Sequence, residues 1–151
     1  MEEKHIPSKN YFTYVARTNM KDLPELAAVE VDKLYAASGE LQLEINGPLE
    51  FIYFDAGADM EKEFLLEIAL PVKETKLDMP LNYSLKKHED FKCLSYIHKG
   101  DLTQLYSVYE KLYADMWNNS QRPTNQIREV YTKFVDMSSA ENVTEIQIGL
   151  Q

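Results

Sequence analysis

Apolar residues recur along the chain with two different periods, and these periods predict where helices and strands lie. Between 102 and 117 the apolar side chains are three and four residues apart, which predicts an amphipathic helix with one continuous apolar stripe. The stripe comprises Leu102, Leu105, Tyr106, Tyr109, Leu112, Tyr113, Met116 and Trp117. A shorter stripe from Leu23 to Leu34 predicts an earlier helix that ends near Gly39.

Six short runs rich in aromatic, β-branched and other apolar residues predict strands. In each half of the chain one run precedes a helix and two runs follow it. The runs are 11–17, 49–54, 64–71, 91–98, 127–134 and 143–150. The charged stretch 73–89, which contains Pro80, is predicted to be a linker, and 118–125, which contains Pro123, a loop.

The order of these elements repeats once along the chain. Lys33-Leu34-Tyr35-Ala36 recurs as Lys111-Leu112-Tyr113-Ala114, an offset of 78 positions (111 − 33 = 78), and Tyr53 and Tyr131 stand at the same offset. The sequence therefore predicts an α+β fold of two strand-helix-strand-strand halves, about 11–72 and 91–150, related by a pseudo-two-fold axis. They should share a curved antiparallel sheet with two helices on one face. Residues 1–151 are expected to form one domain.

The face of the sheet turned away from the helices is predicted to hold a ligand cleft. Alternation along the strands turns Ile52 and Val130 toward the helices, and the apolar positions of 66–70 and 146–150 are expected to join them. The opposite face then carries Phe51, Tyr53, Ile127, Glu129 and Tyr131. A face in contact with water would be polar, whereas aromatic rings around one carboxylate are typical of a concave ligand site.

Glu129 is the candidate for holding a cation. A carboxylate among rings must be protonated, hydrogen-bonded by tyrosine hydroxyls or neutralised by a bound cation. Aromatic faces would add cation–π attraction of roughly 0.5–2 kcal/mol for each well-placed ring. The alternative is that Glu129 pairs with Arg128, Lys133 or another basic side chain on a partly solvated face.

Two further residues complete the candidate ligand contacts. Trp117 closes the helical stripe, where a core position is the more frequent role and a ligand platform is the alternative. Glu145, like Glu67, is a repeated carboxylate that the predicted register places on the same sheet face as Glu129, where it is either solvated or within reach of a ligand.

Composition and charge exclude several classes of function. The 151 residues are 44% hydrophobic and 27% charged, as in soluble globular domains, and the formal net charge of −9 argues against direct DNA binding. Cys93 is the single cysteine and the three histidines lack zinc-site spacing, so we expect no disulfide, no metal site and no cofactor. Without a signal-like or membrane-spanning stretch, we expect a cytoplasmic protein with no membrane contact.

Four short motifs, taken in their spacing, resemble the GyrI-like small-molecule-binding domain family. They are Asn46-Gly47-Pro48 leading to Phe51-Ile52-Tyr53-Phe54-Asp55, His98-Lys99-Gly100, Arg128-Glu129-Val130-Tyr131, and Thr144-Glu145-Ile146-Gln147-Ile148. The resemblance covers about 11–150. It implies a groove between the halves for hydrophobic or cationic compounds, in which Glu129 faces the ligand. Asp101-Leu102 departs from the family, where Pro-Tyr often follows the His-x-Gly step, so no tyrosine role is expected there.

The resemblance leaves three functions open. Family members often follow a helix-turn-helix segment in AraC-type or MerR-type regulators, whereas this chain has about ten residues before its first predicted strand and resembles the stand-alone members. The leading interpretation is a binding protein for hydrophobic or cationic small molecules. The alternatives are a hydrolase of electrophilic cyclopropane-bearing genotoxins, with Glu129 and Tyr131 as catalytic residues, and a protein that inhibits gyrase or partners a regulator. A homodimer formed through exposed edge strands also stays open.

Overall fold

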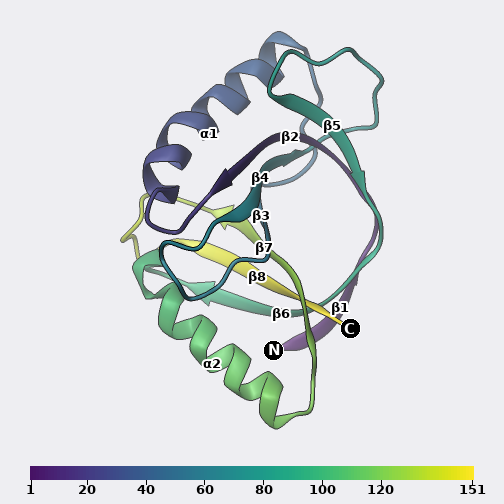
Figure 1. Ribbon diagram of the computed structural model, residues 1–151. Coiled ribbons are helices and arrows are strands. Elements are labelled where there is room, and N and C mark those ends of the chain that lie inside the picture. The colour runs from purple at the N-terminus through teal and green to yellow at the C-terminus, as the bar shows by residue number, and fades with distance from the viewer.

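All 151 residues are described by the computed structural model, in which eight strands form one antiparallel sheet and two α-helices cover part of it (Figure 1). The elements in chain order are β1 (Glu2–Ile6), β2 (Lys9–Thr18), α1 (Leu23–Glu40), β3 (Glu50–Phe54), β4 (Phe64–Pro71), β5 (Tyr83–His88), β6 (Phe91–Lys99), the short 3-10 helix η1 (Leu102–Gln104), α2 (Leu105–Asn118), β7 (Pro123–Lys133) and β8 (Val143–Leu150).

The predicted α+β fold with two repeated halves is confirmed. β2-α1-β3-β4 forms the first strand-helix-strand-strand unit and β6-α2-β7-β8 forms the second. The strand order is β1-β6-β8-β7-β3-β4-β2-β5, so β3 of one half pairs with β7 of the other at the middle of the sheet. This central pair carries most of the predicted site residues.

Two strands lie where none was predicted. β1 occupies the charged N-terminal segment, and β5 lies inside the stretch 73–89, for which the prediction of a linker is therefore wrong over residues 83–88. Their pairing explains both strands: β1 pairs with β6 and β5 pairs with β2, each in antiparallel register. The sequence shows no apolar–polar alternation in these two strands, because their inward positions hold charged residues such as Lys4 and Lys86. These residues contact carboxylates of other strands of the sheet.

Two continuous chain segments, β1–β2 and β5–β6, contain the two edge strands of the sheet, β1 and β5. β1 runs into β2 and β5 runs into β6, and the residue numbers of each pair add up to the same total in β1–β6 and in β2–β5, so the register is continuous. At the break between them the Ser8 amide donates to Asp90 Oδ1 at 3.0 Å. These segments therefore make one long two-stranded ribbon, visible in Figure 1 as the curved strands that sweep around the side opposite the helices.

The sheet has a helix face and an inner face, and both are buried. On the helix face, Leu34 of α1 belongs to a core cluster with Phe51, Tyr53 and Ile68, while Leu112 and Met116 of α2 belong to a second cluster with Ile146. The inner face has no helix over it, yet Tyr11, Ile52, Ala69 and Arg128 are at most 2% exposed. The strong curvature of the sheet and its ribbon shield this face from water.

The predicted assignment of the two faces is right for the apolar rows of β4 and β8 and wrong for β3 and β7. Directly paired residues point to the same face, and the register pairs Phe51 with Ile68 and Glu129 with Ile146. Phe51, Tyr53, Ile127, Glu129 and Tyr131 therefore lie on the helix face with the apolar rows of β4 and β8. The expected cross-strand pairing was one residue off, which moves a whole row of side chains to the other face.

The apolar stripe of α2 is narrower than predicted. Leu112 and Met116 are buried, whereas Tyr106 and Trp117 are 62% and 74% exposed. Neither α-helix is long and apolar enough to cross a membrane.

Candidate functional site

The candidate site is built on the central strand pair β3–β7. Phe51 pairs with Glu129 and Tyr53 pairs with Ile127, so these side chains stand next to one another on the helix face. Tyr131 lies two residues from Glu129 on the same strand and shares its face. The structure thus brings together five of the predicted residues, on the face opposite to the one expected.

Three tyrosine hydroxyls donate hydrogen bonds to the carboxylate of Glu129. Tyr53 and Tyr131 donate to Oε1 at 3.0 and 2.6 Å, and Tyr109 donates to Oε2 at 2.6 Å. A carboxylate has about four lone-pair positions, so three of them are occupied. Glu129 itself is 6% exposed.

The tyrosines of this cluster are held in their protonated form. Burial, followed by the negative charge of Glu129, raises the pKa of Tyr53, Tyr109 and Tyr131 well above the ordinary value of 10.0. All three hydroxyls therefore stay hydrogen-bond donors over the physiological pH range.

Aromatic rings surround the carboxylate. Phe51 contacts Tyr131 edge to face with ring centroids 5.1 Å apart, and Tyr53 lies 5.6 Å from Phe64. Tyr109 stacks on Tyr113 at 6.4 Å along α2. Such rings present apolar surface and negative π faces, which suit a flat or cationic molecule.

No basic side chain forms a salt bridge with Glu129. The predicted alternative partners are placed elsewhere: Arg128 points to the inner face, and Lys133 Nζ lies 3.3 Å from Glu141 Oε1. The alternative that Glu129 pairs with Arg128 or Lys133 in direct contact is therefore wrong. Its charge is met only by neutral hydroxyl donors.

Tyr109 is the member of the cluster that the sequence-based prediction did not single out. It lies on the side of α2 that packs against the sheet. Its neighbours there, Leu105, Leu112 and Met116, carry no polar atom except the methionine sulfur. A buried tyrosine hydroxyl requires a hydrogen-bond partner. That single polar tip in an apolar ridge is the signal that could have identified it.

Two predicted ligand contacts lie away from Glu129. The exposed ring of Trp117 has the Arg122 guanidinium 5.5 Å from its centroid. Glu145 pairs with Val130 and so belongs to the inner face, where Ser95 Oγ and Lys4 Nζ donate to its Oε2 at 2.7 and 3.2 Å. The expectation that Glu67 and Glu145 share the face of Glu129 is therefore wrong, because alternation turns them inward.

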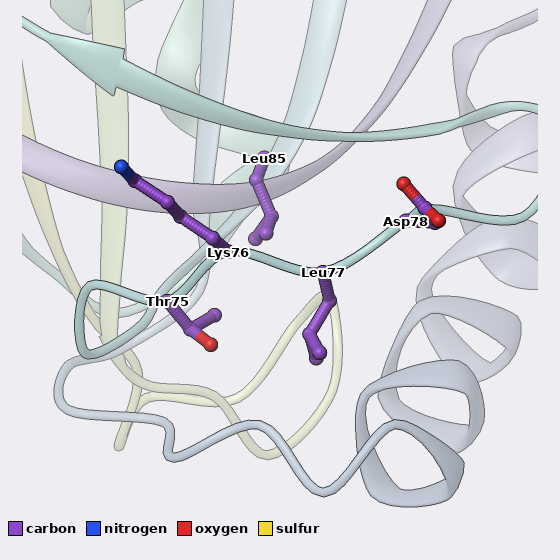
Figure 2. Close-up of a pocket in the computed structure, with 5 residues that line it drawn as sticks. All are labelled: Thr75, Lys76, Leu77, Asp78 and Leu85. Atoms are coloured by element: carbon purple, nitrogen blue, oxygen red, sulfur yellow. The ribbon is translucent and has the colours of Figure 1, made fainter.

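A surface hollow of about 590 Å³ lies apart from this cluster, beside β5. Figure 2 shows its lining by Thr75, Lys76, Leu77, Asp78 and Leu85, with Lys76 and Asp78 extending toward opposite ends. It contains none of the predicted site residues. The structure has no group of three or more His, Cys, Asp or Glu side chains placed to hold a metal ion.

Comparison with known proteins rests on structure, because no family model and no curated protein sequence matches this chain. The C-terminal domain of EcmrR superposes with a TM-score of 0.78 at 21% identity, covering 99% of this chain and 96% of that one. The chain has the fold of a GyrI-like effector-binding domain. In the EcmrR–DNA complex, with a TM-score of 0.79, the matched part is 56% of that chain, so this chain spans about half of its length.

Two other neighbours with this GyrI-like fold differ in what they bind or do. SAV2435, solved with tetraphenylphosphonium bound, has a TM-score of 0.66 at 14% identity and is covered to 93%. A hydrolase from Listeria innocua has a TM-score of 0.63 at 11% identity and is covered to 91%. Both alignments include 99% of this chain. At such identities the likeness establishes a shared fold and nothing about the chemistry of this site.

Proposed function

We propose that this chain binds a hydrophobic organic cation between α2 and the β3–β7 pair, with Glu129 as the countercharge. The observation that carries the proposal is a carboxylate that is 6% exposed, hydrogen-bonded by three hydroxyls and without a cation in contact. Burying a charge costs several kcal/mol unless it is compensated, so a bound cation would relieve this cost.

The occupied lone pairs of Glu129 favour one class of cation. A primary ammonium needs hydrogen-bond acceptors and would compete with Tyr53, Tyr109 and Tyr131 for the same oxygens. A quaternary or delocalised cation needs none, and it gains instead from charge attraction and from ring faces. The tetraphenylphosphonium in SAV2435 is a cation of this kind and supports the choice of probe.

Access to the site would involve Tyr109. Its ring is half-buried and comes from α2, whereas the other two donors come from the sheet. A ligand that reaches the carboxylate would therefore displace this helix-borne side chain first. Sheet residues would stay in place because neighbouring strands hold them.

The test is binding of tetraphenylphosphonium and of a rhodamine-type dye to the whole chain, followed by calorimetry and fluorescence. Glu129→Gln should weaken cation binding by about 10-fold to 150-fold, the equivalent of a charge-assisted contact of about 1.5–3 kcal/mol. Glu145→Gln is the matched control, because this carboxylate lies on the inner face. Equal affinity of wild type and Glu129→Gln would refute the proposal.

Hydrolysis is a second candidate, favoured by the 2.6 Å contacts of Tyr109 and Tyr131 with Glu129. In this mechanism Glu129 would take a proton from a water molecule whose oxygen bonds to a cyclopropane carbon. The strained C–C bond would break, its electron pair would pass to a conjugated carbonyl oxygen, and Tyr131 would donate a proton to that oxygen. Incubation with a cyclopropane-bearing alkylating agent tests it. Product formation above the buffer rate that Glu129→Gln abolishes would support hydrolysis, and a rate equal to buffer would exclude it for that substrate.

A further inference from the structure

The inner face of the sheet carries three buried or half-buried carboxylates, and each has a basic partner on the ribbon. Glu50 accepts from Lys9 at 3.1 Å, Glu67 from Lys86 at 3.0 Å, and Glu145 from Lys4 at 3.2 Å. His88 Nε2 also lies 2.7 Å from Glu67 Oε1. The carboxylates of this face are therefore already compensated by lysines.

Arg128 is the basic residue of the inner face that has no carboxylate within salt-bridge distance. It is 2% exposed. Its Nη1 donates to the hydroxyl of Tyr11 at 3.2 Å, and that hydroxyl in turn donates to Glu50 at 3.0 Å. In the amide orientation that satisfies both groups, the Gln126 oxygen accepts from Arg128 Nε and Nη2 at 3.1 and 3.2 Å. The guanidinium carbon lies 4.0 Å from the ring centroid of Phe91.

Arg128 and Glu129 are thus consecutive residues with opposite charges, both buried and both hydrogen-bonded only to neutral groups. Alternation along β7 places them on opposite faces of one strand. Charges separated by one strand still interact appreciably, since the protein interior screens them much less than water does. Glu50 and Glu67 have lysine partners, whereas Glu129 and Arg128 are a buried acid and a buried base that form no ion pair.

We propose that Arg128 is the countercharge of Glu129 across β7, and that it sets how strongly the site attracts a cation. In the absence of ligand, Arg128 would offset the cost of burying the Glu129 carboxylate. A bound cation would then share this carboxylate with Arg128. This sharing would weaken the attraction of Glu129 for hydrated amines, so contact with the aromatic rings would decide the affinity. This second statement rests on the proposed function, whereas the first does not.

Few titratable groups surround Arg128 and Glu129. Glu129 is faced by Tyr53 from β3, Tyr131 from β7 and Tyr109 from α2, while β8 presents Ile146. Arg128 is faced by Tyr11 of β2, Cys93 of β6 and, through Tyr11, Glu50 of β3. Burial raises the pKa of Cys93 to about 11.

The first test is a double-mutant cycle in the unliganded protein, built from Glu129→Gln, Arg128→Gln and their combination. Removing either charge leaves the other buried without compensation, so each single variant should lower the urea midpoint. The double variant should recover about half or more of the summed loss. Tyr11→Phe with Glu129→Gln is the control, since it removes a neutral partner of Arg128 and should show additive losses.

Each outcome of the cycle either supports or overturns the proposed coupling between Arg128 and Glu129. If Arg128→Gln does not fold but the double variant does, the rescue supports the coupling directly. Additive losses, or a double variant no better folded than Arg128→Gln alone, would overturn it. This result stands whether or not any cation binds.

The second test is tetraphenylphosphonium binding at one neutral pH to wild type, Arg128→Gln and Arg128→Lys. Arg128→Gln removes a positive charge that shares the Glu129 carboxylate with the ligand, so this variant should bind the cation at least about 5-fold more tightly than wild type does. Arg128→Lys keeps the charge and should keep the wild-type affinity. Equal affinity of all three proteins would overturn the proposal, whereas no binding to wild type would count against the proposed function alone.

Discussion

The hydroxyl of Tyr109 is the contact of Glu129 that comes from a helix. Tyr109→Phe removes one of three donors from a buried carboxylate, so the free energy of unfolding should fall by about 1.5–3 kcal/mol. Urea denaturation measures the loss. Tyr106 lies on the same helix and is 62% exposed, so Tyr106→Phe is the matched control and should stay within about 0.5 kcal/mol of wild type.

Ionisation of the tyrosines gives a second prediction for single residues. Burial and the charge of Glu129 raise the pKa of Tyr53, Tyr109 and Tyr131 above 10.0. Because the folded pKa lies above the unfolded one, their contribution to stability is complete below pH 10 and is lost as pH rises above it. Ultraviolet titration should find a group of the ten tyrosines that ionises only on unfolding. Ten tyrosines that all titrate near pH 10 in the folded protein would contradict this.

Sequence could identify the acid of the site and two of its three donors. Glu129 stood out as a lone carboxylate among rings, and Tyr53 and Tyr131 fell on its face by alternation. The sequence shows Tyr109 only as one residue of the apolar stripe, because a helical stripe does not reveal which hydroxyl finds a polar partner on the sheet. Trp117 lies at the end of that stripe, directly after the buried Met116, and its own ring is 74% exposed.

Among the secondary-structure elements, strand β8 depends on a glycine on its inner face. A Cβ at Gly149 would lie 3.0 Å from the Gln126 carbonyl oxygen and 3.1 Å from the Phe91 ring, and it would also clash with the Thr124 hydroxyl. Gly149→Ala should therefore destabilise the protein by about 1–3 kcal/mol through overpacking.

Gly39→Ala is the matched control for this substitution. Gly39 lies in α1, and a methyl group added there would have no other atom within 4 Å, so alanine should raise the free energy of unfolding by about 0.5–1 kcal/mol. Thermal unfolding of both variants checks that Gly149→Ala lowers the stability and that Gly39→Ala raises it. A Gly149→Ala protein as stable as wild type would show that β7 and β8 can separate at this point.

The six strands with apolar runs were predictable, whereas β1 and β5 were not. Lys86 and His88 of β5 face Glu67, and Lys4 of β1 faces Glu145, so the inward positions of these strands are charged. An alternation of charged and apolar residues indicates a solvated segment when the partner carboxylates are unknown. The signal lay in the matching acids on β4 and β8, far away in the sequence.

For the molecule as a whole, the ion pairs of the inner face predict sensitivity to acid. Burial opposes ionisation of Glu67 and Glu145, but hydrogen bonds from His88 and Lys86 to Glu67, and from Ser95 and Lys4 to Glu145, outweigh it and lower both pKa values below 4.5. Their contribution is present above pH 4.5 and is lost as pH falls through the folded values. Urea denaturation between pH 6 and pH 3 should show that the free energy of unfolding falls steeply as the pH is lowered. In Glu67→Gln this fall should be shallower.

The choice between the two sheet faces could not be made from sequence because both faces are dry. Alternation normally separates an apolar face from a wet one, but here Ile52 and Tyr11 on one side are as buried as Ile68 and Ile146 on the other. Curvature of the sheet is a long-range property, set by strands that meet only after folding. Register in the centre therefore had to come from the structure.

The shared ribbon also limits how the molecule can change shape. The segments β1–β2 and β5–β6 run through both halves without a break in register. The two halves therefore cannot move apart as rigid bodies unless backbone hydrogen bonds along this ribbon break. Accommodation of guests of different sizes must then come from tilting or fraying of the helical layer over a stiff frame. Amide exchange should accordingly be fastest in α2 and slowest in β3 and β7.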